Sequence, residues 1–295
     1  MAQRTTWRWM FWSTSIFQAV MILASFLAFR ETSPRIILRR RAEKLRRETG
    51  DRRYYTTAEQ IDGDRNIFRI VGRSLSRPLR LLTFHPIIQA MAILSGFSYG
   101  VLYIVLSTFA DLWVTAYHQR VDISGLHYIA LALGEIVGSQ LTGYLQDKVF
   151  VKLKARRDGE ATPELHLPML IPGAALTPFL LIAYGWTVHF RVHWAIVDVC
   201  AFLLACSMQS AGQPLQAYVI DCYPDHASSA TAAQQVLRSL SAFGFPLFAP
   251  RMYDVLGYGW GNTMLAFIWA AIAISAPLLL WRYGARLRAK AQDSY

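Results

Sequence analysis

The sequence predicts an all-α membrane protein, a multi-pass helical bundle, and its composition and apolar patterning carry this prediction. Of the 295 residues, 54% are hydrophobic and only 17% are charged, whereas soluble domains average about 25% charged residues. The apolar residues come in long segments, and the mean hydropathy is positive, at 0.27. The alternating ten-residue strands of a membrane barrel are absent from the pattern. We therefore expect membrane-crossing helices and not a soluble enzyme.

Seven segments are long enough to span a bilayer, because a span needs about 20 mostly apolar residues. Each is expected to be helical, since a backbone amide or carbonyl left unpaired in lipid costs several kcal/mol. In chain order the segments are Trp9–Phe29, Pro86–Leu106, Gly125–Leu145, Pro168–Val188, Trp194–Leu215, Ala230–Pro250 and Gly261–Trp281.

The basic residues are distributed unevenly between the connections. The loops at 30–83 and 146–167 and the tail from Arg282 hold 24 of the 30 Lys and Arg residues, and the opposite connections hold five. Because cytoplasmic loops retain positive charge, we expect the amino terminus outside and the carboxyl terminus in the cytoplasm. The net charge of +11 then follows from membrane topology, and no nucleic-acid partner is expected.

One long connection divides the chain. The expected parts are a first transmembrane helix (1–29), a cytoplasmic basic linker (30–83), a six-helix half (84–281) and a cytoplasmic tail (282–295). In the linker, Ile37, Leu38, Ala42 and Leu45 recur at helical spacing between basic residues, which predicts a membrane-surface helix. The first segment also has features of a signal peptide, but its apolar run exceeds the usual core of about 7 to 15 residues. We interpret it as an anchor.

A series of landmarks follows the chain: WRWMFW, then Glu31 and Thr32 before LRRRAEKLRRETG, then RPLRLL, FSYGVLY, GLHYIALALGEIVG, GYLQDKVFVKLK, YVIDCY and SSATAAQQVLRSLSAFGFPLFAPRMYDVLGYGWGN. Their order resembles the carboxyl-terminal seven of twelve helices in fungal major facilitator superfamily transporters of the drug:proton antiporter type. WRWMFW is similar to the start of the sixth helix, and GLHYIALALGEIVG to the eighth. The chain departs from the family pattern at Ser33 and Pro34.

The resemblance implies proton-coupled efflux of small organic molecules, such as drugs or secondary metabolites, with no cofactor, across a fungal membrane, in particular the plasma membrane. Helices one to five of the family have no counterpart in the sequence. Since such transporters bind substrate between two six-helix halves, we expect a missing amino-terminal half as a partner, besides substrate, protons and lipid bilayer. The alternatives are a non-transporting remnant or a modulatory membrane protein. A channel or seven-helix receptor is a third class, although the long first cytoplasmic loop argues against a receptor.

Two charged residues lie within predicted spans, where a charge is costly and indicates function. Glu135 either exchanges a proton or holds a cationic substrate, or it is an interior Glu hydrogen-bonded to a neighbouring helix. Arg238 either attracts an anionic group or pairs with Glu135 in one transport state, or it is part of a fixed structural ion pair or lies along a water-filled crevice. The residues alone leave these alternatives open.

Amides and glycines in the spans give two further hypotheses. Gln209, Gln213 and Gln216 are spaced by four and three residues, so they share one helix face. They either line a substrate path or hydrogen-bond to adjacent helices, and Gln234 and Gln235 are weaker candidates of the same kind. The two G-x-x-x-G steps, Gly96 with Gly100 and Gly134 with Gly138, predict close helix packing.

The stretch GYLQDKVFVKLK resembles the family's G-x-x-x-D-[RK] gating loop, with Gly143, Asp147 and Lys148 at the motif positions. The resemblance implies that Asp147 pairs with a basic residue and helix-terminal amides in one transport state; the alternative is an ordinary charged turn. No metal site is expected, because His189 and His193 lack a nearby third ligand.

Overall fold

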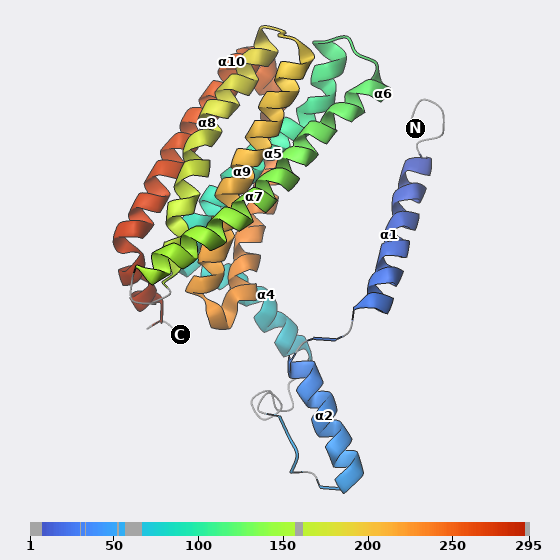
Figure 1. Cartoon of the computed structure of the whole chain (residues 1–295), viewed down its shortest axis with the longest axis vertical. Coiled ribbons are helices and arrows are strands. Elements are labelled where there is room, and N and C mark those ends of the chain that lie inside the picture. Colours follow the sequence, from blue (N-terminus) through green and yellow to red (C-terminus); the bar gives the residue numbers. More distant parts are fainter. Residues whose placement is uncertain are drawn as a thin grey trace. The chain divides into compact units, whose positions relative to one another are not determined.

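A computed structural model describes residues 8–29, 31–32, 34–51, 53–56, 67–156 and 162–292 of the chain. The chain divides into two units, Met1–Arg73 and Ser74–Tyr295, and all regular elements of the described residues are helices (Figure 1).

The first unit contains α1 (Arg8–Ala28) and α2 (Pro34–Thr49). The large side chains of α1 are exposed, and α1 is long and apolar enough to cross a membrane. In α2, basic residues pair with glutamates one turn on, Arg39 with Glu43 at 3.2 Å and Lys44 with Glu48 at 3.7 Å. The predicted helix in the basic linker is confirmed, and its placement at a membrane surface stays a prediction.

A further helix, α4 (Ile67–Phe84), replaces the end of the predicted linker. The prediction missed it because basic residues and Pro78 interrupt its apolar residues. The helix ends at Phe84, and the backbone of the next residue, His85, is extended (φ −105°, ψ 106°). A residue before proline disfavours the helical region, so Pro86 separates α4 from the next helix.

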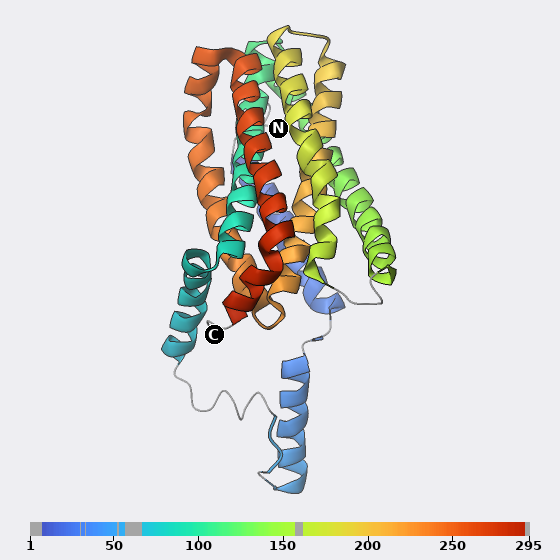
Figure 2. The ribbon, with the colours of Figure 1, turned by 90° about the vertical axis from the view of Figure 1, so that its left-hand side faces the viewer.

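The second unit is a helical bundle of α5 (Pro86–Thr115), α7 (Tyr128–Ala155), α8 (Leu167–His189), α9 (Trp194–Cys222) and α10 (Ala227–Gln292) (Figures 1 and 2). Short helices precede three of these: α6 (Val121–Ser124) with η1 (Gly125–His127), η2 (Pro163–His166) and η3 (Pro224–His226).

α10 consists of two limbs, residues 227–256 and 258–292, which meet at Gly257 (φ 69°, ψ 168°). A straight helix of its 52 membrane-candidate residues would be about 78 Å long, against a hydrocarbon core of about 30 Å. In Figure 2 the limbs, coloured orange and red, run in opposite directions from the turn. Glycine tolerates positive φ, so one residue reverses the chain where the prediction had a longer connection from 251 to 260.

Six helices of the described part are long and apolar enough to cross a membrane. Because α10 holds the sixth and seventh predicted segments, all seven correspond to these six helices. The predicted all-α, multi-pass bundle is confirmed.

Two buried apolar clusters stabilise the bundle at different levels. One includes Phe109, Trp113 and Tyr184, and the other includes Ile87, Tyr218 and Trp269. Outward-facing apolar side chains such as Phe179, Phe243 and Val255 remain exposed, as expected for helices that face lipid.

The glycine steps allow close helix contacts, as predicted. A Cβ atom at Gly134 would lie 2.4 Å from the Phe202 carbonyl oxygen of α9, and one at Gly138 would lie 2.7 Å from Cys206 Cα. On α5, a Cβ at Gly100 would lie 2.5 Å from the Phe245 ring of α10. α7 therefore approaches α9, and α5 approaches α10, at distances that only glycine allows.

Candidate functional site

A cavity of about 210 Å³ lies between the helices of the bundle, lined from α5, α7, α9 and both limbs of α10. Its apolar lining includes Leu102, Met208 and Trp269. Its polar lining consists of Ser95, Ser98, Tyr99, Glu135, Gln209, Gln213, Gln216, Gln234 and Arg238. A few polar groups in an apolar cavity are typical of a small-molecule site.

All five residues that the sequence singled out for coupling or substrate contact line this cavity: Glu135, Arg238, Gln209, Gln213 and Gln216. They come from α7, α9 and the first limb of α10. Gln213 donates from Nε2 to Ser139 Oγ of α7 at 2.6 Å, so it also fastens α9 to α7. Gln213 thus makes an interhelical hydrogen bond and also lines the cavity, and the role of this cavity as a substrate path stays a prediction.

Glu135 and Arg238 share the cavity, but no ion pair joins them among the described residues. The guanidinium carbon of Arg238 instead lies 3.5 Å from the ring centroid of Tyr99 on α5. This is a cation–π contact. Sequence reasoning missed Tyr99, because an aromatic residue in a span has no distinguishing pattern.

Gln234, one turn before Arg238, is only 3% exposed and lines the same cavity. Its Nε2 atom and the Nε atom of Arg238 are buried, and neither has a hydrogen-bond partner in the part of the chain that the structure describes. Gln235, in contrast, is exposed and donates to Ser239 Oγ at 3.4 Å. Two residues on one face of the first limb of α10 thus line the cavity and carry a donor that no described residue satisfies.

Comparison with known proteins decides the family. The Major Facilitator Superfamily profile matches residues 1–246. A probable efflux pump of Aspergillus flavus, mfs2, is 51% identical over 291 residues, which cover 99% of this chain and 69% of the relative. The chain belongs to the major facilitator superfamily. The resemblance to fungal transporters of this superfamily is confirmed.

Further relatives are also fungal membrane transporters by name. The efflux pump vrtL of Penicillium aethiopicum is 38% identical over 98% of this chain and 56% of its own length. An uncharacterized transporter of Schizosaccharomyces pombe is 39% identical over 98% of this chain and 58% of its own length. The major facilitator chain described here thus spans just over half the length of these two relatives. No solved structure gives a significant match.

The stretch that resembles the superfamily's gating loop is helical in this chain. Gly143, Asp147 and Lys148 lie within α7, which continues to Ala155, whereas the prediction placed 146–167 in a loop. Apolar residues and lysines at 148–154 allow the helix to extend past the hydrocarbon. Asp147 is exposed, and Lys148 Nζ lies 4.2 Å from the Tyr144 ring centroid. The gating role of these residues stays a prediction.

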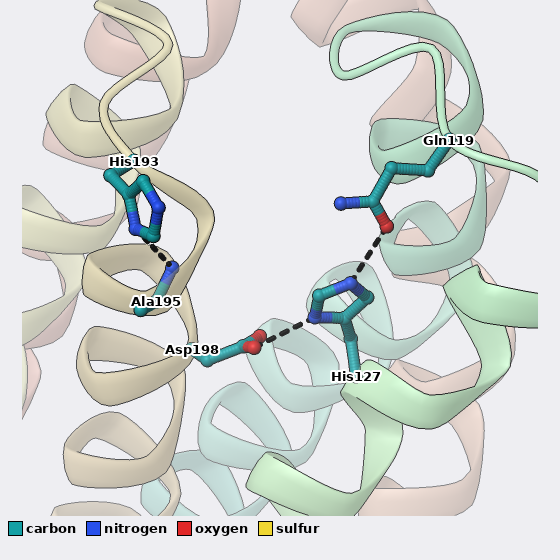
Figure 3. A network of polar contacts seen from close by, with 5 residues as sticks. All are labelled: Gln119, His127, His193, Ala195 and Asp198. Carbon is teal, nitrogen blue, oxygen red and sulfur yellow. Dashed lines mark hydrogen bonds and ion pairs between the residues drawn. The ribbon is translucent and has the colours of Figure 1, made fainter.

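Sequence reasoning missed a polar group, the outer cluster, formed by Gln119, His127 and Asp198 (Figure 3). His127 Nδ1 lies 2.7 Å from Asp198 Oδ2, and Nε2 lies 2.8 Å from Gln119 Oε1. The His127 ring stacks on Trp113, with 3.7 Å between ring centroids. The available signal was Asp198, an acidic residue inside an apolar segment.

Tyr117 lies beside the outer cluster and donates its hydroxyl to the Val192 carbonyl at 2.8 Å. Burial raises the pKa of this hydroxyl against the opposing charge of Arg191, and Asp198 adds to the increase. Tyr117 therefore acts as a neutral hydrogen-bond donor that connects the turn after α5 to the turn before α9.

A second group, the inner cluster, repeats the same residue types with Gln146, His166 and Asp221. His166 Nε2 lies 2.9 Å from Asp221 Oδ2, and Gln146 Nε2 donates to His166 Nδ1 at 3.0 Å. The names of the clusters follow the predicted topology, in which Lys148, Lys152 and Lys154 mark the cytoplasmic end.

The described residues contain no group of three His, Cys, Asp or Glu side chains that could hold a metal ion. Of the two histidines considered for such a site, His193 caps α9 by accepting from the Ala195 amide at 3.3 Å (Figure 3), and His189 contacts the Trp186 ring edge.

Proposed function

We propose that this major facilitator chain acts, not as an enzyme, but in proton-coupled efflux of small organic molecules, with the bundle cavity as one wall of the substrate path. The observation that carries the proposal is the convergence of Glu135, Arg238 and three glutamines on one cavity. The efflux names of two relatives support the direction of transport. The proposed location is the plasma membrane.

Glu135 is the proposed proton-exchanging group. It lies on α7 within a membrane-candidate helix, where an ionised carboxylate is costly, and no hydrogen bond or ion pair in the described part fixes it in one state. A carboxyl that is neutral when the cavity is dry and ionised when water enters gives the two cavity states different proton affinities. This difference is what couples proton binding to a conformational equilibrium.

The second wall of the path is the proposed contribution of an amino-terminal transporter half. In transporters built from repeats, substrate lies near the midplane between two halves that rock against each other. Asp147 and Lys148, at the predicted cytoplasmic end of α7, are the proposed contacts that stabilise one of the two states.

The test uses inside-out vesicles from yeast that express either this chain or a fusion in which the unmatched portion of the Aspergillus flavus relative precedes it. The probes are anionic fluorescein and cationic rhodamine 6G. We expect a pH gradient to drive uptake of at least one probe, and Glu135→Gln to abolish this gradient dependence while exchange of labelled for unlabelled probe continues.

Asp122→Asn is the control, because Asp122 is an exposed carboxylate paired with Arg120 outside the cavity. Gradient-driven uptake that persists in Glu135→Gln removes Glu135 from the mechanism. Absence of gradient-driven uptake in both the chain and the fusion contradicts proton-coupled efflux as a whole.

A further inference from the structure

Two cavity-lining residues on the first limb of α10, Gln234 and Arg238, each carry a buried hydrogen-bond donor that is unsatisfied. Their spacing of four residues places them on one helix face. The Nε2 atom of Gln234 and the Nε atom of Arg238 are buried, and the described residues supply no acceptor for either. An unsatisfied buried donor is destabilising, and more so when it is charged, so an acceptor atom that reaches either residue would be stabilised.

The position of Arg238 is set by an aromatic ring and not by a carboxylate. Its guanidinium lies over Tyr99, and no ion pair connects it to Glu135, the acidic residue of the same cavity. A guanidinium stacked on a ring keeps its edge available for in-plane hydrogen bonds. Arg238 is thus held in place without its charge being neutralised by a described side chain.

The remaining lining defines the rest of a ligand. Leu102 and Met208 contribute apolar side chains to the lining, and so does the edge of Trp269, which is otherwise buried. Glu135 on α7 places a carboxyl in the same cavity, which disfavours a second negative charge on the ligand. The cavity of about 210 Å³ is small compared with drug sites of about 300–1,000 Å³, so it fits one compact moiety.

We propose that Arg238 and Gln234 form a subsite for the single carboxylate of a small aromatic organic acid, whose ring packs against the apolar part of the lining. Guanidinium and carboxylate make charge-assisted, two-point hydrogen bonds, and the Gln234 amide adds a third. This inference rests on the proposed function in so far as it takes the cavity as the substrate path.

The experiment measures binding, which requires no proton gradient. The full chain, purified in detergent, is titrated with benzoate and 1-naphthoate and with the matching neutral amides, benzamide and 1-naphthamide. Binding of radiolabelled probes is followed by equilibrium dialysis. We expect saturable binding of each acid at least about tenfold tighter than of its amide, as one charge-assisted hydrogen bond predicts.

Arg238→Gln is expected to lower affinity for the acids about tenfold or more and affinity for the amides less than about twofold. Arg238→Lys, which keeps the charge but lacks the planar fork, should fall between these values. Gln234→Leu should weaken acid binding about fivefold. The matched controls are Gln235→Leu and Arg251→Gln, because Gln235 and Arg251 are exposed side chains of the same limb outside the cavity lining.

Retained amide binding shows that a variant is folded. Equal affinity for acids and amides, no saturable acid binding, or unchanged acid affinity in folded Arg238→Gln overturns the subsite. Gradient-driven uptake together with equal binding of acids and amides would contradict the subsite and support proton-coupled efflux. Tighter binding of the acids without gradient-driven uptake would support the subsite and contradict proton-coupled efflux.

Discussion

The outer and inner clusters combine the same three residue types but differ in how the glutamine meets the histidine ring. At the outer cluster, the ring nitrogens of His127 lie next to oxygen atoms of Asp198 and Gln119. At the inner cluster, Nδ1 of His166 lies next to the amide nitrogen of Gln146, and Nε2 lies next to Asp221 Oδ2.

Burial accompanies this difference. The Asp198 side chain is 18% exposed and its Oδ1 atom is buried without a partner in the described part, whereas Asp221 is 46% exposed. Ion pairs are worth little when water screens them, and a buried pair is costly to break because one charge remains uncompensated. The comparison shows that residue type alone does not determine how much a polar contact contributes to stability. The burial of the contacting side chains also determines it.

The largest expected effect comes from separating the helices that both clusters connect. Gly138→Val would place a Cβ 2.7 Å from Cys206 Cα, so α7 must move away from α9 and both clusters must open. We expect a loss of more than about 4 kcal/mol of stability, seen as loss of a thermal unfolding transition in detergent. Gly244→Val is the control, since no other atom lies within 4 Å of a Cβ at Gly244. An unchanged transition in Gly138→Val would mean that the clusters, and not the glycine contact, determine the helix spacing.

The next effect compares the clusters directly. Asp198→Ala leaves His127 buried without its carboxylate and should cost about 3 kcal/mol, whereas Asp221→Ala should cost less than about 1 kcal/mol. Chemical denaturation of the two variants, side by side in one detergent, measures the difference. Equal losses would contradict the assignment of the outer cluster as the tighter one.

The smallest effect concerns pH at the inner end. Burial, followed by the positive charge of Arg80, lowers the pKa of His85, so the unfolded chain binds its proton more readily than the folded chain. The stability contributed by neutral His85 is therefore full above a pH of about 6.5, the ordinary histidine pKa, and is lost as the pH falls below it.

We expect His85→Gln to reduce the fall in melting temperature between about pH 7.5 and pH 5.5. His118→Asn is the control, because His118 is exposed in a turn with positive φ, which Asn tolerates. A pH slope identical to that of the wild type in His85→Gln would show that His85 does not titrate differently on folding.

Sequence reasoning predicted the parts of the fold that depend on local pattern. The spans follow from apolar length, and the contacts at Gly134 and Gly138 follow from the small-residue step. The membrane charges Glu135 and Arg238 were identifiable because each is costly in an apolar segment. Their common cavity was not predictable, since it depends on how four helices pack.

Other features depend on partners far apart in the chain. His127 meets Asp198 across 71 residues, and His166 meets Asp221 across 55 residues, so no spacing rule finds either pair. α4 was missed because its basic residues suit a linker as well as a helix. The helical extension at Asp147 was missed because charge at a predicted span end was taken as the end of the helix.

The single-residue turn at Gly257 has a consequence for biosynthesis. The two limbs of α10 have no loop between them. One limb therefore has no flexible connection that would let it cross the bilayer while the other stays in water. We expect the limbs to enter the membrane together as a helical hairpin. Phe97 of α5, whose ring contacts Phe245 of the first limb and Trp269 of the second, then meets both partners in one step.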